Sequence, residues 1–581
     1  MVLRLIQLSL RHRGISIAIL VASILLSLAS ASRVRLGFQF RDGYAYPGSP
    51  HYPALERYSR EFGDPGGYVV VLLEADDVFR KQNLAYIKDL TRDLQPEPAF
   101  IRIRSLATVP VVRLDGETVE SGPLLEDLPD SPERIARLRA AALGSRLLVR
   151  RLISRDGKAT AVLAELRKPA VLASTQEQKE AIAAVAKAVA QRPPPPGLSA
   201  RITGAPVLET TATDMMLGDQ LVLIPAVLTV ILLTLVVIFR SIQGVLLSLA
   251  PLAVTVIWFA GMLGLTGRPI DILGSSFLVI LLTYAVVDPI FMLTRYLSKI
   301  ERGYDREGAI LESLSELILP CFLASVTTAL GFAAFAVATL PMVRYFGYAI
   351  AAGVMFAFLT TIAVLPLLLS LVPPPRRASS SFPLSRALRR VFDKLWRALN
   401  ARRRIVIAAG LFVLALGMAS GASLRIDNHY VGLLADGPER DAVLKLEEKL
   451  SGVVRLVVYL EGSPGAMRRP DVLRAIATVD ALAEQYPLVN SSISLMDLLA
   501  EMNAAFNADG ASAREVADYP ALVAQYLTFV DPAERADFVN DDQSRSHIAI
   551  LIEDPGSAAV RQLRVSLQRA IDQQQFDKLG I

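Results

Sequence analysis

Cysteine and histidine are scarce in this chain of 581 residues. Cys321 is the single cysteine, so no disulfide can form within the chain and its polar regions must fold on hydrophobic cores of their own. The four histidines are scattered, which leaves little material for a zinc site or a histidine-based catalytic centre: His12, His51, His429 and His547. A Walker-type Gly-Lys-Ser/Thr loop is also missing. We therefore expect no enzyme, no metal site, no cofactor and no ATP-driven motor.

A strong excess of charge of one sign is missing too. The chain has 61 basic and 56 acidic residues, and a net charge of +5 is too small to indicate a nucleic-acid partner. Apolar residues, by contrast, are abundant: they make up 52% of the sequence and give a mean hydropathy of +0.42. Both values lie above the range of ordinary soluble proteins, so the sequence predicts a membrane protein with membrane lipids around it.

Seven apolar stretches are long enough to cross a hydrocarbon core of about 30 Å, which takes about 20 helical residues. They cover residues 15–31, 220–239, 245–265, 273–293, 317–338, 343–371 and 404–423. The first stretch follows three arginines and ends in small residues, so a cleavable signal peptide is the alternative for it. The similar seventh stretch, in the middle of the chain, favours a membrane span.

The basic residues of the short loops set the orientation, because such loops stay in the cytoplasm while long domains cross largely regardless of charge. With the N-terminus inside, the cytoplasm receives Arg240 and the basic segments 295–306 and 376–404. The short outer loops then hold little beyond Arg268 and Arg344. We expect a multi-pass protein of the inner (plasma) membrane with a cytoplasmic N-terminus.

The expected fold class is a polytopic α-helical membrane protein with two α/β extracytoplasmic domains of the split βαβ, ferredoxin-like kind. Its parts are a first transmembrane helix (1–31), a first extracytoplasmic α/β domain (32–219), a five-helix transmembrane bundle (220–372), a basic cytoplasmic linker with an amphipathic helix (373–403), a seventh transmembrane helix (404–423) and a second, incomplete extracytoplasmic α/β domain (424–581).

Within the linker, Ser379–Ser381 is typical of a flexible connection, and apolar residues then recur at helical spacing from Leu384 to Leu399. Arginines occupy the opposite face. This helix is expected to lie on the anionic inner surface of the membrane, and a plain solvated linker is the alternative.

The two polar regions are similar to each other, which indicates an internal duplication. Segment 68–74 matches 455–461, positions 84, 87 and 90 match 473, 476 and 479, Ser105 matches Ser494, and segment 161–165 matches 549–553. The first region has a last strand at 202–206, and the second stops before its counterpart. Because five further spans would follow in a full duplication, we expect a truncated or partial chain.

A span, a large outer domain, further spans and a repeat of that unit resemble the RND superfamily, and within it the MMPL and Patched-like branch. This branch has a buried Asp in the fourth span, then an Arg-Tyr pair and a glycine-containing loop, which here are Asp288, Arg295-Tyr296 and Gly303. The fifth and sixth spans are similar at Pro320, Ser325 to Thr328, Gly331-Phe332, Arg344 to Gly347 and Leu365-Pro366. Pro289 and Phe291 depart from the branch. Its members often have a polar residue at the position of Pro289 and a His at the position of Phe291.

The resemblance implies a proton-driven secondary transporter that exports lipids or other hydrophobic molecules by proton antiport. Its partners would be protons, the hydrophobic substrate and a second helix bundle, for which a second subunit is one source. The alternative is a non-transporting membrane regulator or accessory protein, similar to the sterol-sensing branch, that binds a lipid among its spans. An inactive truncated product is a third reading.

The residues alone also single out Asp288. It lies seven residues, or about 10 Å of helix, before Arg295, which is too deep for a short side chain to reach the membrane surface. An ionised carboxylate there costs several kcal/mol, so it must be neutral, paired or beside water. Pro289 leaves the carbonyl of Ala285 without its helical partner.

We predict a proton relay of four residues: Asp288, Tyr284, Thr327 and Thr328. Tyr284 lies one turn before Asp288 on the same helix face. The hydroxyls of Ser325, Thr327 and Thr328 can reach across to the fourth span, or they can bond to carbonyls of their own helix. The alternative for Asp288 is a neutral group that only holds helices together, and Cys321 is interpreted as a small packing residue.

Overall fold

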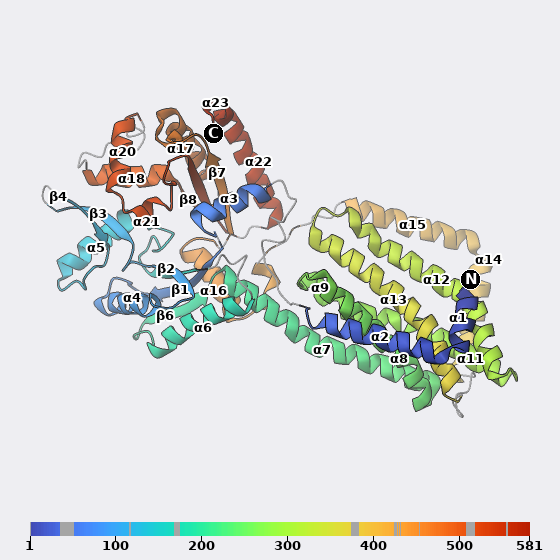
Figure 1. Ribbon diagram of the computed structural model, residues 1–581. Coiled ribbons are helices and arrows are strands. Elements are labelled where there is room, and N and C mark those ends of the chain that lie inside the picture. Colours follow the sequence, from blue (N-terminus) through green and yellow to red (C-terminus); the bar gives the residue numbers. More distant parts are fainter. Residues whose placement is uncertain are drawn as a thin grey trace. The chain divides into compact units, whose positions relative to one another are not determined.

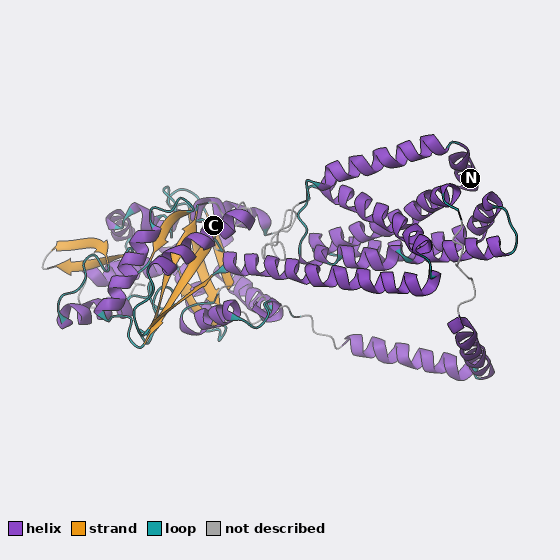
Figure 2. Cartoon of the chain, turned by 90° about the horizontal axis from the view of Figure 1, so that it is seen from below, coloured by secondary structure: helices purple, strands orange, loops and turns teal. Residues whose placement is uncertain are grey.

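The computed structural model describes residues 2–34, 51–64, 66–115, 118–167, 175–373, 383–422, 427, 429, 431–452, 454–506, 518–553 and 556–581. The chain forms two compact units. The bundle unit contains Met1–Phe38 and Thr213–Arg425, and the α/β unit contains Gln39–Ala212 and Ile426–Ile581. All described strands belong to the α/β unit (Figure 2).

Seven helical segments among the described residues are long and apolar enough to cross a membrane, which is the number expected. They are α2 (Arg13–Ala31), α7 (Ala205–Phe239), α8 (Ile242–Thr266), α9 (Ile272–Ser275) with α10 (Phe277–Ala285) and α11 (Val287–Glu301), α12 (Arg306–Ala333) with η2 (Ala334–Val337), α13 (Pro341–Leu371) and α15 (Arg403–Ala422). Two further helices are α1 (Val2–Arg11) and the amphipathic α14 (Pro383–Ala401), which lies where the linker helix was expected. Ser379–Ser381 lies outside the described residues.

α7 begins at Ala205, fifteen residues before the apolar run that predicted it. The carboxylates of Glu209, Asp214 and Asp219 end the apolar run but not the helix, since the only proline near them, Pro206, is in the first turn, where proline is tolerated. The boundary between the α/β unit and the bundle unit therefore falls after Ala212 and not at residue 219.

α8, α10, α11 and α13 form the interior of the bundle, and α2 lies along α8. A Cβ added at Gly261 or Gly264 of α8 would strike the backbone of Ser27 or Ser30. Close approach over small residues is typical of helices that pack within a membrane. This packing favours a span over a cleavable signal peptide for α2.

The first repeat, residues 51–203, contains a four-stranded antiparallel sheet of order β2-β5-β1-β6. Its elements are α3 (Tyr52–Phe62), β1 (Tyr68–Ala75), α4 (Lys81–Leu94), β2 (Phe100–Arg104), the hairpin β3 (Pro110–Asp115) and β4 (Thr118–Pro123), α5 (Pro132–Gly144), β5 (Ala159–Leu166), α6 (Thr175–Gln191) and β6 (Leu198–Thr203). Alternate residues of β1, Val69, Val71 and Leu73, face the core under α4 and α6. Without the hairpin and α5, this is the ferredoxin-like βαββαβ order.

The second repeat, residues 427–581, has a three-stranded sheet of order β7-β9-β8. Its elements are η3 (Val431–Leu433), α16 (Pro438–Lys449), β7 (Val454–Glu461), η4 (Ala466–Arg468), α17 (Pro470–Ala483), β8 (Val489–Ile493), α18 (Leu495–Phe506), α20 (Pro520–Phe529), α21 (Pro532–Arg535), β9 (Arg545–Ile552), α22 (Ser557–Gln574) and α23 (Phe576–Leu579). Read from the other edge, β8-β9-β7 repeats β2-β5-β1. The described residues contain no counterpart of β6.

The registers of the two sheets agree down to one irregularity. The pairing of β2 with β5 shifts between Phe100 and Arg102, and that of β8 with β9 shifts between Val489 and Ser491. In these registers Leu163 corresponds to Ala549, two residues away from the match read in the sequence. A slip of two residues leaves every side chain on the same face of the sheet, which is why the pattern alone did not reveal it.

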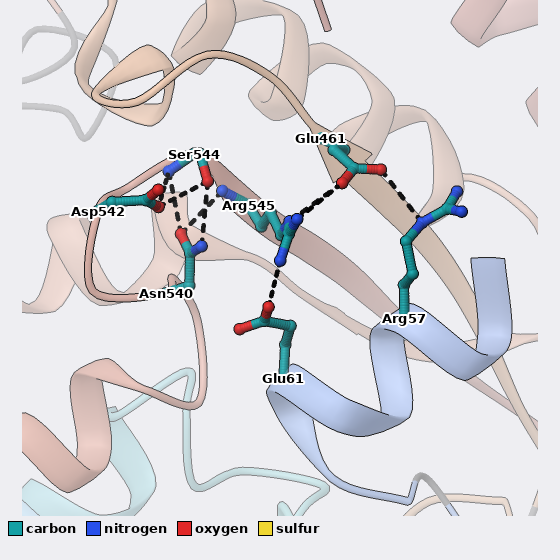
Figure 3. Close-up of polar contacts among 7 residues, drawn as sticks. All are labelled: Arg57, Glu61, Glu461, Asn540, Asp542, Ser544 and Arg545. Atoms are coloured by element: carbon teal, nitrogen blue, oxygen red, sulfur yellow. Dashed lines mark hydrogen bonds and ion pairs between the residues drawn. The ribbon is translucent and has the colours of Figure 1, made fainter. Parts of the chain in front are cut away.

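The two repeats exchange a helix. α3 precedes the first sheet in the chain but packs on the second, where the Tyr58 ring meets the rings of His547 and Tyr459 at centroid distances of 5.2 and 6.2 Å. Arg57 Nε lies 3.2 Å from Glu461 Oε2, at the end of β7. Figure 3 shows Glu461 between Arg57 and Arg545.

α16 makes the reciprocal contact with the first sheet. Leu446 and Leu450 pack on Val70 and Leu72, the β1 residues that face away from α4 and α6. In Figure 1, α3 accordingly lies beside the elements of the second repeat and α16 beside those of the first. The two domains expected from the sequence are thus one interlocked unit.

We predict that Leu446→Ala destabilises the α/β unit by about 2–5 kcal/mol, because Leu446 is 6% exposed and its loss leaves a cavity on the first sheet. Pulse proteolysis in urea measures the change on the full-length protein. The control is Leu444→Ala on the same helix, where the side chain is 44% exposed and little change is expected. Equal effects of the two substitutions would contradict the exchange of helices.

Candidate functional site

The fourth span is interrupted in its middle. α10 ends at Ala285, Val286 forms a turn, and α11 begins at Val287. Pro289 explains the interruption, because it has no N–H to offer to the carbonyl of Ala285. The next bond is long, with 3.4 Å between Ile290 N and Val286 O. The interruption frees backbone polar groups at a depth where lipid offers no partners.

Asp288 lies in the first turn of α11, beside this interruption. Its side chain is buried, with the residue 8% exposed. The free N–H groups at the start of a helix favour negative charge, which partly offsets the cost of a carboxylate in hydrocarbon. Among the described residues, Oδ2 of Asp288 has no hydrogen-bond partner. A buried carboxyl oxygen without a partner indicates a group that exchanges a proton or contacts water.

α12 supplies the neighbours of Asp288. The side chains of Cys321 and Ser325, one helical turn apart, both lie beside its carboxyl. Ser325 is fully buried, and its Oγ accepts a hydrogen bond of 3.3 Å from Oη of Tyr284. The structure therefore joins Tyr284 to Asp288 through Ser325, and these groups could pass a proton along a short chain of hydroxyls.

Thr327 and Thr328, the other two residues of the predicted relay, are not brought to Asp288. Each hydroxyl donates to the carbonyl of Ala324 at 2.9 Å, within its own helix. This is the alternative that hydroxyls in membrane helices commonly adopt. The hydrogen bonds thus give no support for a relay through these two residues.

Cys321 is the neighbour that the sequence analysis did not connect with Asp288. Its interpretation as a packing residue overlooked that residues four apart share one helix face, so that Cys321 must face Asp288 if Ser325 does. The hydroxyl of Ser325 pointed to the correct helix, and the spacing of the two residues was the signal for the thiol.

A cluster of ion pairs holds α11 and α12 together further along. Lys299 is 5% exposed in its side chain and lies 2.6 Å from Glu316 Oε1 and 3.4 Å from Glu312 Oε1. Arg295 pairs with the other oxygen of Glu316. The sequence analysis used Arg295 and Lys299 only to orient the protein. Their pairing fixes how the two helices face each other, and with it the position of Ser325 beside Asp288.

We predict that Ser325→Ala destabilises the bundle by about 1–3 kcal/mol, because the half-buried hydroxyl of Tyr284 loses its acceptor, the buried Oγ of Ser325. Thr327→Ala, on the same helix, removes only an exposed hydroxyl bonded to its own backbone and should change little. Thermal unfolding of the full-length protein in lipid nanodiscs compares them. If Thr327→Ala lowered the stability of the bundle as much as Ser325→Ala, the hydrogen bond with Tyr284 would not be the cause of the effect.

Comparison with known proteins agrees with a membrane protein. The model of the MMPL family matches residues 44–407, which is more than half of the chain. A curated protein of Methanocaldococcus jannaschii, described as a membrane protein, is 27% identical over 181 residues, or 31% of this chain and 47% of that relative. The match thus spans about half the length of the relative. Since the family model covers α7 to α13 with Asp288 among them, the chain belongs to the MMPL family, and membership indicates a transporter-like membrane protein.

Proposed function

We propose that the protein is a proton-driven secondary transporter that exports lipids or other hydrophobic molecules. The observation that carries the proposal is Asp288, a buried carboxyl in a broken helix of the bundle, with a hydroxyl chain from Tyr284 through Ser325 at its side. Charged groups inside membrane spans are rare and mark ion or proton pathways by default. Broken helices are the usual place for such sites in secondary transporters.

The proposed location is the inner (plasma) membrane, with the N-terminus in the cytoplasm and both repeats on the outer side. The basic residues of the short loops support this orientation. α14 supports it as well, since its described apolar side chains are exposed along one stretch of a helix rich in arginine: Val391, Phe392, Leu395, Trp396 and Leu399. Such a helix fits an anionic inner membrane surface.

We also propose that a second bundle, in another subunit, faces α11 and α12. α12 carries exposed apolar residues close to the site, among them Phe322 and Leu323, which lie within one helical turn before the buried Ser325. A proton site at the junction of two bundles can connect with either side of the membrane when one bundle moves against the other.

The test is Asp288→Asn, which keeps the shape of the side chain and removes its exchangeable proton. The assay uses membrane vesicles from the cells that naturally produce the protein, with their lipids labelled in bulk by radioactive acetate, so that any partner bundle is present. Lipid transfer driven by an imposed proton gradient should fall by about 100-fold or more, while the amount of protein in the membrane stays unchanged.

Asp271→Asn is the matched control. The carboxylate of Asp271 caps α9 at the start of the same span by accepting from the N–H of Gly274 at 2.7 Å, and Asn caps a helix equally well. Its transport should be normal. Normal, gradient-dependent transfer by Asp288→Asn would make Asp288 a group that only holds helices together, and a lipid-binding regulator would then be the better function.

A further inference from the structure

One polar contact recurs in both repeats, with different chemistry. In the first repeat, Thr91 of α4 and Ser105 after β2 share a hydrogen bond between their hydroxyls at 2.8 Å. The N–H of Ser105 donates to Oγ1 of Thr108 at 2.9 Å, and the N–H of Ala107 donates to Oγ of Ser105 at 3.1 Å. These three bonds join the helix to the end of the strand.

The second repeat has the same three bonds, but two of the hydroxyls are carboxylates. Ser494 Oγ donates to Asp480 Oδ2 at 2.8 Å, the N–H of Ser494 donates to Asp497 Oδ2 at 2.9 Å, and the N–H of Met496 donates to Ser494 Oγ at 3.2 Å. Asp480 and Asp497 are 6% and 5% exposed. The first repeat shows that hydroxyls suffice to join helix and strand, so the two buried carboxylates need a further explanation.

Part of the explanation is local. Asp497 is the third residue of α18, and a carboxylate there caps the helix through the N–H of Ser494. Asp480, in the last turn of α17, caps no helix, and its two oxygens accept hydrogen bonds from the hydroxyls of Ser492 and Ser494. Its Oδ2 and Oδ2 of Asp497 lie 2.8 and 3.4 Å from the Ser494 hydroxyl, which has one proton to give. When both carboxylates are ionised, the single hydroxyl proton can serve only one of the two carboxylate oxygens, so the other oxygen contact is not a hydrogen bond.

The pair lies where the first repeat reaches into the second. The segment Ser145–Leu147 follows α5, and the side chain of Leu147 is buried in the hydrophobic core of the second repeat. Arg146 Nε lies 3.2 Å from Asp497 Oδ1, and its Nη2 lies 2.6 Å from Glu484 Oε1. The carboxyl of Glu501, one turn after Asp497 on α18, lies beside Ser145 and the backbone of Leu147. We call Ser145–Leu147 the anchor segment.

We propose that Asp497, buried beside Asp480, holds an exchangeable proton, and that uptake and release of this proton adjust how firmly the anchor segment binds the second repeat. The anchor is therefore a pH-sensitive contact between the repeats. It is independent of Asp288, which belongs to the bundle unit.

The electrostatics of the contact agree with this assignment. Burial raises the pKa of Asp497 to about 7, the charge of Asp480 raises it further, and Arg146 opposes the rise. Burial also raises the pKa of Glu501. An acid whose pKa is higher in the assembled unit than in the open chain binds more protons when assembled. Acidification through about pH 7 therefore strengthens the anchor, and alkaline pH weakens it.

Other buried titratable groups lie between the repeats. Burial raises the pKa of Glu534 to about 7, so this carboxyl acts in the same direction as Asp497. Burial lowers the pKa of His547 to about 3, so its imidazole opposes assembly only where the open chain would be protonated, below its usual value of 6.5. Arg104 holds the pKa of Asp537 below its usual range, against its burial. Between about pH 8 and 6.5 the carboxyls with raised pKa values therefore dominate.

The test is infrared spectroscopy of the full-length protein in lipid nanodiscs, with aspartate labelled by 13C at the side-chain carboxyl so that glutamate bands separate. The wild type should show a carboxylic-acid band of aspartate with about ten protonated to one ionised at pH 6, and the reverse ratio at pH 8. In Asp480→Thr, which installs the residue of the first repeat, the midpoint of this band should move to lower pH, because Asp497 loses a neighbouring negative charge. Asp288 is present in both proteins, so its signal cancels in the difference.

A second variant keeps the proposal testable if Asp480→Thr does not fold. The side chain of Arg146 is 61% exposed, so Arg146→Gln should fold, and loss of the cation should move the midpoint of the same band to higher pH. Amide exchange at Leu147, corrected for its intrinsic pH dependence, should be slower at pH 6 than at pH 8 in the wild type, and this difference should be smaller in Asp480→Thr. The proposal is wrong if the band is unchanged in Asp480→Thr, if its midpoint ignores Arg146→Gln, or if no aspartate titrates between pH 6 and 8.

Discussion

The hydrocarbon of a membrane offers no hydrogen bonds to the protein backbone, and the structure of the bundle depends on that constraint. The spans meet it as helices, in which backbone groups find their partners within the same segment. The fourth span meets it only in part, because Pro289 breaks the helix between Ala285 and Val287 and leaves Asp288 beside the break. Polar groups of α12 lie beside the break: Ser325 and Cys321 lie against the carboxyl of Asp288. Buried Lys299 and its partners hold α11 to α12.

A different constraint shapes the α/β unit. Each sheet is covered by helices of its own repeat on one face, and the apolar residues of its other face must be buried as well. Each repeat covers the second face of the other repeat's sheet, through α3 and α16. The exchange makes separation of the repeats costly, so motions that open the unit must act at smaller contacts. The anchor segment is such a contact, and its carboxylates respond to pH in a range that a proton gradient spans.

The spans, the repeat and the strand order could be predicted from the sequence because each rests on periodicity or on long apolar runs. The early start of α7 could not, since carboxylates interrupt hydropathy without breaking a helix. The exchange of helices depends on tertiary packing that no local pattern records. At the site, Asp288, Tyr284 and Ser325 were predictable from chemistry, whereas the positions of Thr327 and Thr328 depend on a competition between two kinds of hydrogen bond.

The central claim is that Asp288 binds and releases a proton inside the bundle. A hydrophobic carbodiimide, which reacts only with protonated carboxyls that it reaches from the lipid, tests this directly when the modified peptide is identified by mass spectrometry. The account predicts modification of Asp288 at a rate that falls as the pH rises, and slower modification when the substrate lipids are being transported. An Asp288 that stays unmodified at every pH, or reacts at a rate independent of pH, would contradict it.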